Sequence, residues 1–172
     1  MWRQTVVVCA LVVGICSEAA GANAPILLEF NDGDLPLIRG VIEAAAARLA
    51  HCDCQKVLSD FADGKGVLLS AKLTASGRDA VEAFSSLRFV DSPFARLCRT
   101  GNVLAFTSPG SQVVHICSWK FRSRSIRRSV RTEFIMIHEF LHTLGLGENL
   151  PTSRDITARV AARCGGRVNI GG

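Results

Sequence analysis

The chain has 172 residues, of which 48% are hydrophobic and 20% charged, and its formal net charge is +5. This composition is typical of a globular protein, and the length suits a single domain with a core of its own. The chain has no low-complexity tract and no internal repeat, which excludes a disordered protein or a repeat array.

The N-terminal residues 1–22 have the layout of a signal peptide. One arginine precedes the apolar run TVVVCALVVGIC, and the small residues of SEAAGANAP follow it. A run of 12 residues is too short to anchor the chain in a bilayer. We expect cleavage after Ala22 or Ala24 and favour Ala22, because cleavage before Pro25 should be poor. The sequence therefore predicts an exported protein, secreted or periplasmic, with one domain over residues 23–172 and no stable membrane insertion once the leader is removed.

The first half of the domain contains a strand and a long helix. PILLEF, residues 25–30, is typical of a strand, and Leu35–Ala50 has apolar residues at helical spacing. Between residues 55 and 91 the pattern is less regular. GKGVLLSAKL is an ambiguous apolar run, SGRDAVEAFSSL favours a short helix, and LRFV favours a strand.

The second half has the clearest elements. Two branched apolar runs around PGS predict a hairpin, Asn102–Ser108 with Gln112–Cys117. A long helix is expected over Ser123–Leu144, and a last one over Ser153–Arg163, where TSRD resembles a capping box. We therefore predict an α+β fold in which a small mixed or antiparallel sheet packs on the long helix.

The stretch HEFLHTLGLGE carries the chemistry. His138 and His142 are four residues apart, so on a helix both rings project from one face and can meet one metal ion. Glu139 lies about a quarter-turn round, where it can reach a water at the metal without being a ligand. Zinc makes such a water acidic, and a neighbouring carboxylate can take its proton and pass it to a leaving amine.

A catalytic zinc needs a third ligand from beyond the helix. Glu148 follows His142 by six residues, and Gly145 allows the chain to turn sharply back toward the metal. Asp155 competes for this role, but it also completes the capping pattern that begins at Thr152. Spacing favours Glu148.

This stretch resembles the metzincin clan of zinc peptidases, whose pattern is HExxHxxGxx followed by His or Asp. It is also similar to small exported bacterial metallopeptidases with HExLHxLGLGEN followed by SR-ITARV-ARCG, over about His138 to Gly165 and more faintly in the hairpin ending ICSWKF. The resemblance implies a minimal metallopeptidase domain with one zinc ion on His138, His142 and Glu148, and Glu139 as the base.

The chain also departs from the metzincin pattern. It has no tyrosine, and its two methionines, Met1 and Met136, both precede Glu148. Metzincins place a methionine turn beneath the metal, and several place a tyrosine near it. The floor of the site and the stabiliser of the oxyanion must therefore be other residues here.

The resemblance gives His115 a candidate role. In such peptidases a strand above the active helix pairs with the substrate backbone. His115 lies on the second hairpin strand, so it is a candidate substrate-binding residue; the alternative is an ordinary strand histidine that packs or is exposed.

The expected function is that of an exported zinc metalloendopeptidase, a hydrolase that cleaves a peptide or protein substrate and works as a monomer. Three alternatives compete with it: a non-catalytic or latent zinc module that holds a partner peptide, a disulfide-stapled structural protein without metal, and two solvated surface histidines. An intact Glu139 argues against a binding module, which needs no base.

Five cysteines remain after the leader, enough for two disulfides in an oxidising compartment. Cys98 and Cys117 flank the hairpin and are expected to pair, and Cys164 is expected to pair with Cys54 or Cys52. The alternatives are that HCDC, residues 51–54, clamps a metal, and that a leftover thiolate ligates the zinc in a latent form.

A basic stretch precedes the active helix. KFRSRSIRRSVR carries six cations and no acid: Lys120, Arg122, Arg124, Arg127, Arg128 and Arg131. It favours acidic substrate segments or anionic surfaces if it leads toward the cleft, and it is otherwise a solvated face. Nucleic acid is not an expected partner, because aromatic residues are not interleaved with these cations.

Overall fold

The computed structural model describes residues 24–123 and 131–166. The expected signal peptide lies outside these residues, as do Arg124, Arg127 and Arg128 of the basic stretch. The elements follow in the order β1 (Ile26–Leu28), α1 (Leu35–Leu49), α2 (Cys52–Gln55), η1 (Lys56–Ser59), α3 (Leu69–Ser76), α4 (Ala80–Ser85), β2 (Arg88–Asp91), α5 (Arg96–Thr100), β3 (Ala105–Phe106), β4 (Val113–Ile116), η2 (Ser118–Arg122), α7 (Arg131–Thr143) and α8 (Ser153–Cys164), with η marking short 3₁₀ helices. The fold is α+β, as predicted.

The four strands form one mixed sheet in the order β1-β2-β4-β3. β1, β2 and β4 are parallel, whereas β3 pairs antiparallel with β4 and lies at the edge. Phe89 and Asp91 of β2, like Val114 and Ile116 of β4, are buried and alternate with more exposed neighbours. This alternation is what a sheet with one face toward the core requires.

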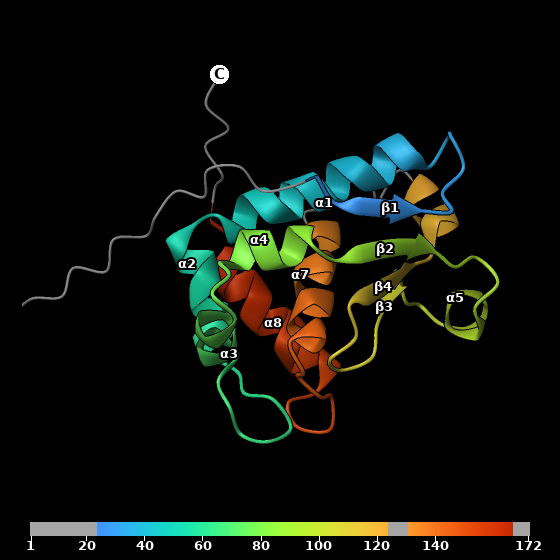
Figure 1. Ribbon diagram of the computed structural model, residues 1–172. Coiled ribbons are helices and arrows are strands. Elements are labelled where there is room, and N and C mark those ends of the chain that lie inside the picture. The colour runs from blue at the N-terminus through green and yellow to red at the C-terminus, as the bar shows by residue number, and fades with distance from the viewer. Residues whose placement is uncertain (1–23, 124–130, 167–172) are drawn as a thin grey trace, which may run out of the picture.

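α7 is the central element of the core. It packs against α1 and α8 and also contacts β3 and β4. Figure 1 shows it between the sheet and the group of helices α2, α3 and α8. Phe140 of α7 is fully buried and packs edge-on against Phe84, which in turn contacts Phe89. The helix that carries HEFLH is therefore anchored from several sides.

Most predicted elements are present, with some corrections. The hairpin forms, but β3 is only two residues long, because the chain leaves the ladder at Thr107, whose hydroxyl donates to the Val113 carbonyl oxygen at 2.6 Å. The second half of the ambiguous run GKGVLLSAKL, residues 64–73, belongs to helix α3, which begins at Leu69. The short helices α2 and α5 were not predicted; four or five residues are too few to show helical periodicity.

Within the described residues, two disulfides join segments that are separate in the sequence. Cys98 of α5 bonds to Cys117 after β4, the expected pair. Of the two partners considered for Cys164, the structure pairs it with Cys54, which ties α8 to α2. Disulfides are typical of proteins in oxidising compartments. Within residues 24–123 and 131–166, no helix has the length and hydrophobicity needed to cross a membrane.

Candidate metal centre

The last turns of α7 bring two histidines together. His138 and His142 are both 4% exposed, which rules out solvated surface histidines. Their ring centroids are 4.7 Å apart, and their Nε2 atoms approach to 2.9 Å. The spacing of four residues therefore does what the sequence predicted, because it places both rings on one face of the helix.

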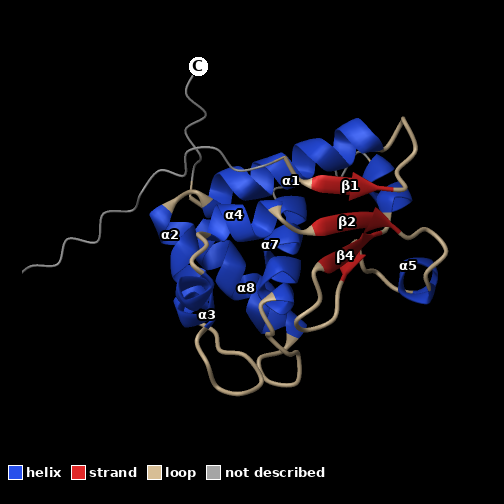
Figure 2. Cartoon of the chain, viewed as in Figure 1, coloured by secondary structure: helices blue, strands red, loops and turns tan. Residues whose placement is uncertain are grey.

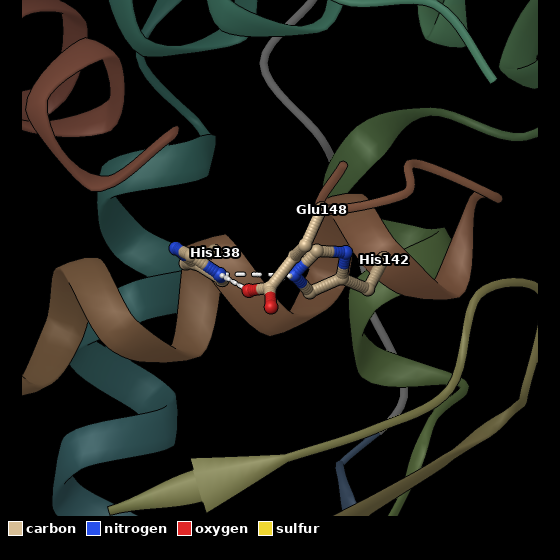
Figure 3. Close-up of side chains that lie close together, drawn as sticks. All are labelled: His138, His142 and Glu148. Atoms are coloured by element: carbon tan, nitrogen blue, oxygen red, sulfur yellow. Dashed lines mark hydrogen bonds and ion pairs between the residues drawn. The ribbon is translucent and has the colours of Figure 1, made fainter. Parts of the chain in front are cut away.

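A sharp turn then returns the chain to the histidines. Gly145 has φ +105°, a conformation that side-chain-bearing residues rarely adopt. Had the helix continued, Glu148 would lie roughly 9 Å along the axis from His142. Instead its Oε1 is 3.3 Å from His138 Nε2 and 3.2 Å from His142 Nε2. Figure 3 shows the carboxylate between the two rings.

The three ligand atoms have the separations of a metal site. The distances among the two Nε2 atoms and Oε1 are 2.9, 3.2 and 3.3 Å. A tetrahedral zinc ion with bonds of about 2.0–2.2 Å separates its ligand atoms by roughly 3.3–3.5 Å. His138, His142 and Glu148 could therefore hold a metal ion after a shift of a few tenths of an ångström.

The hydrogen bonds behind the rings orient their Nε2 atoms toward one point. His142 Nδ1 lies 2.6 Å from the Leu146 carbonyl oxygen, which can only accept, so Nδ1 carries a proton and Nε2 is the ring atom that faces the ligand group. There it lies 3.2 Å from the Glu148 carboxylate. His138 Nδ1 is held in turn by the Thr157 hydroxyl at 2.9 Å. Such outer partners orient metal-binding imidazoles and fix their tautomer.

Electrostatics favour the metal-binding forms of two of the three residues, His138 and Glu148. Burial, together with the charge of His142, lowers the pKa of His138 to about 4, so its ring is neutral at neutral pH. Burial opposes ionisation of Glu148, but hydrogen bonds and charge from His138, His142 and Ser153 lower its pKa overall. The Glu148 side chain is 51% exposed, so the site opens to solvent on its side.

Glu139 lies beside the ligand group and is not part of it. Its carboxyl group lies near the backbone of Thr107, just after the end of β3, and this contact lowers the pKa of Glu139. The residue is 7% exposed. Burial, aided by the negative charge of Glu148, raises the pKa of Glu139 to about 8 in the metal-free protein. A buried carboxylate with a raised pKa is the kind of group that exchanges protons near neutral pH.

The other candidates lie elsewhere. Asp155 is at the start of α8, where it forms the capping box with Thr152, and it does not join the ligand group. No cysteine joins that group in the described part of the chain. His115 lies on β4 rather than on the edge strand; its Nδ1 is 2.8 Å from the Ser92 hydroxyl and its ring stacks on Phe106.

The basic stretch divides where the described residues stop. Lys120 donates to the carbonyl oxygens of Gly101 and Val103, and Arg122 forms a double hydrogen bond with the carboxylate of Asp34. These two cations therefore have structural partners. The remaining arginines of the stretch lie outside the described side chains.

Sequence reasoning missed the residues that support the site from outside. Thr157 holds His138, and Lys72 donates to the Leu144 carbonyl oxygen at 2.6 Å. Lys72 is 72 residues away from Leu144 along the chain, and no local pattern links them. The sequence DGKG, residues 63–66, is typical of a turn, but it gives no indication of what that turn contacts.

Comparison with known proteins adds no relative. No protein-family model matches the chain, and neither a curated protein nor a solved structure matches it. The function must therefore be argued from the site itself.

Proposed function

We propose that this protein is an exported zinc-dependent metallopeptidase that acts as an endopeptidase. The observation that supports it best is the compact triangle of His138, His142 and Glu148 ligand atoms with a buried, non-ligand Glu139 beside it. Two imidazoles and one carboxylate are a known catalytic zinc set, which leaves a position for water or substrate. The two disulfides support export to an oxidising compartment.

Each residue then has a role in peptide hydrolysis. Zinc on this ligand set would supply a Lewis acid that polarises the scissile carbonyl and acidifies water. Glu139 would accept the proton of the attacking water and deliver it to the leaving amine. The nearby Thr107 backbone lowers the pKa of Glu139 and so favours its ionised form against the effect of burial. Leu146 and Thr157 keep both rings oriented.

The family assignment in this proposal is a minimal metzincin-like domain. It rests on HExxHxxGxxE together with the turn at Gly145 that makes the last residue a neighbour of the histidines. Met136 is buried in the core on α7 and precedes the motif, so it does not form a methionine turn after it. A peptide or protein substrate and a monomeric state belong to the same proposal.

The competing function is a zinc module that binds a partner peptide without cutting it. The burial of Glu139 argues against this alternative. A carboxyl group in such a position costs stability unless it is used or paired, and a module that only binds has no need of a proton acceptor.

The decisive experiment compares the wild type with Glu139→Gln and a matched control, Glu82→Gln, which changes an exposed glutamate on α4. Metal content is measured by elemental analysis, and cleavage of a mixed peptide library by mass spectrometry. We expect one zinc in all three proteins, cleavage by wild type and control, and a loss of at least a hundredfold in Glu139→Gln. If all three proteins bind zinc and none cleaves the library, the result supports the binding module. If none of the three binds zinc, the result contradicts both functions.

A further inference from the structure

Three large apolar side chains on and near α5 are exposed to solvent. Phe94 is 87% exposed, and Leu97 and Trp119 are each 48% exposed. Arg99 and Thr100 line both the hollow beside Phe94 and the hollow beside Trp119, so the surface is continuous. Figure 2 shows α5 beyond the ends of β2 and β4, at the margin of the molecule. We refer to Phe94, Arg96, Leu97, Arg99, Trp119 and Lys120 as the α5 platform.

The platform is held firmly to the rest of the fold. The disulfide between Cys98 and Cys117 joins α5 to the segment that carries Trp119, and both sulfurs belong to fully buried residues. The Lys120 ammonium donates to the carbonyl oxygens of Gly101 and Val103 and lies 5.4 Å from the Trp119 ring centroid. The disulfide and these hydrogen bonds therefore fix the segments that carry the exposed apolar side chains. Contiguous exposed apolar groups of this kind mark contact surfaces.

The segment of the sequence that carries the platform has charged residues of a single sign. Residues 92–132 contain eight arginines and lysines and no aspartate or glutamate, although the whole chain has 15 acidic residues. Arg96 and Arg99 are exposed, and neither forms an ion pair with any residue that the structure describes. The platform thus offers free positive charge directly beside aromatic and aliphatic side chains.

We propose that the α5 platform docks this protein on the surface of anionic phospholipid membranes. The aromatic and aliphatic side chains of the α5 platform can enter the boundary between headgroups and acyl chains, while its arginines contact the lipid phosphates. A negatively charged bilayer surface complements the acid-free segment. This is peripheral attachment, and it is independent of the metal centre. A purely ionic partner would match the arginines but would leave Phe94 and Leu97 without an apolar environment.

The test uses Trp119 as its own reporter. The chain has only two tryptophans, so Trp2→Phe in the full-length protein leaves Trp119 as the sole one. The probe is vesicles of 30% phosphatidylglycerol in phosphatidylcholine, compared with pure phosphatidylcholine. With the anionic vesicles we expect Trp119 emission to shift to the blue and to be quenched by brominated acyl chains. Raised salt should weaken the effect, because surface charge is screened.

Two variants separate the charged part from the apolar part. Arg96→Gln with Arg99→Gln should weaken vesicle binding roughly thirtyfold, at about 1 kcal/mol for each basic residue near the surface. Phe94→Ser with Leu97→Ser should abolish the Trp119 shift. The matched controls are Arg39→Gln with Lys65→Gln, which remove two exposed cations elsewhere, and Val67→Ser, which removes an exposed apolar residue. Circular dichroism confirms that each variant folds.

Several outcomes would overturn the proposal. One is co-sedimentation with vesicles while Trp119 emission stays unchanged, which would assign binding to another segment such as the apolar N-terminal run. Another is an equal loss of binding in the control variants. A third is a Trp119 shift with polyglutamate and none with vesicles, which would identify an acidic polypeptide as the partner instead.

Discussion

The ammonium group of Lys72 lies 2.6 Å from the carbonyl oxygen of Leu144, directly after the end of α7. The same ammonium is 3.0 Å from the carboxylate of Asp63, which in turn accepts hydrogen bonds from the backbone N–H groups of Lys65 and Val67. The hydrogen bond from Lys72 is the main reason that the pKa of Asp63 is lowered to about 2. Lys72 and Asp63, both outside the HExxHxxGxxE motif, thus support the turn that leads to Glu148. We refer to this pair as the bracket.

Removing this bracket should weaken metal binding. Lys72→Met leaves the Leu144 carbonyl without its donor and the Asp63 carboxylate without its cation, so the turn before Glu148 loses a support. We expect the free energy of unfolding to fall by about 1–2 kcal/mol and the zinc affinity to fall roughly tenfold. Urea unfolding and competition with a chromogenic chelator measure the two quantities.

Lys65→Met is the matched control, because Lys65 is an exposed lysine whose backbone alone contacts Asp63. It should leave both quantities unchanged. Wild-type zinc affinity in Lys72→Met would show that the turn keeps its shape without the bracket.

The two glycines of the turn should differ sharply. Gly145 has φ +105°, and a Cβ there would lie 2.9 Å from Lys72 Nζ and 3.2 Å from Asp63 Cβ. A Cβ added at Gly147 would have no atom within 4 Å. We expect Gly145→Ala to destabilise the protein by about 1–3 kcal/mol and to lower zinc affinity, whereas Gly147→Ala changes little. Thermal unfolding with and without zinc tests this, and equal effects of the two substitutions would contradict it.

The sequence predicted the parts of this site that depend on local geometry. The four-residue spacing of His138 and His142, the turn at Gly145 and the capping box of Thr152 with Asp155 are all properties of short segments, and all are present. The capping box also explains why Asp155 is occupied elsewhere. Local rules sufficed because helix periodicity and left-handed glycine conformations operate over one or two turns.

The parts that escaped prediction depend on tertiary packing. Nothing in the sequence shows that Lys72 meets Leu144, that Thr157 meets His138, or that Glu139 meets Thr107. The sheet shows the same limit. Its strands were expected, but the parallel pairing of β1, β2 and β4 depends on how the intervening helices cross, which short apolar runs do not encode.

The third ligand can be tested directly against its competitor. Glu148→Gln removes one negatively charged oxygen from the ligand triangle, and we expect zinc affinity to fall at least a hundredfold. Asp155→Asn removes one partner of the capping box and should cost about 1 kcal/mol of stability while leaving zinc affinity unchanged. Isothermal titration with zinc distinguishes the two variants. A larger loss of zinc affinity in Asp155→Asn would move the third ligand to α8.

The buried carboxylate of Asp34 should make stability depend on pH in acid. Arg122 donates two hydrogen bonds of 2.8 Å to it and Asn31 one of 2.7 Å. The Arg122 bond, opposed by burial and assisted by Asn31 and Ser118, lowers the pKa of Asp34 from 3.8 to about 2. Between these values the unfolded chain binds more protons than the folded one, so stability rises with pH in this window. The contribution is complete above about pH 4 and is lost as the pH falls toward 2.

The size of this effect is set by solvent screening, since the Arg122 side chain is 61% exposed. We therefore expect about 1 kcal/mol rather than the full value of the shift. Asp34→Asn should be less stable than wild type at pH 7, and the gap should narrow as the pH falls from 4 to 2. Comparing the two proteins cancels the similar contributions of Asp60 and Asp63, whose pKa values are also lowered. Asp32→Asn, an exposed neighbour, should lower stability less at pH 7. A gap between wild type and Asp34→Asn that stays constant from pH 7 to pH 2, measured by urea unfolding, would show that the Arg122 pair does not contribute to acid sensitivity.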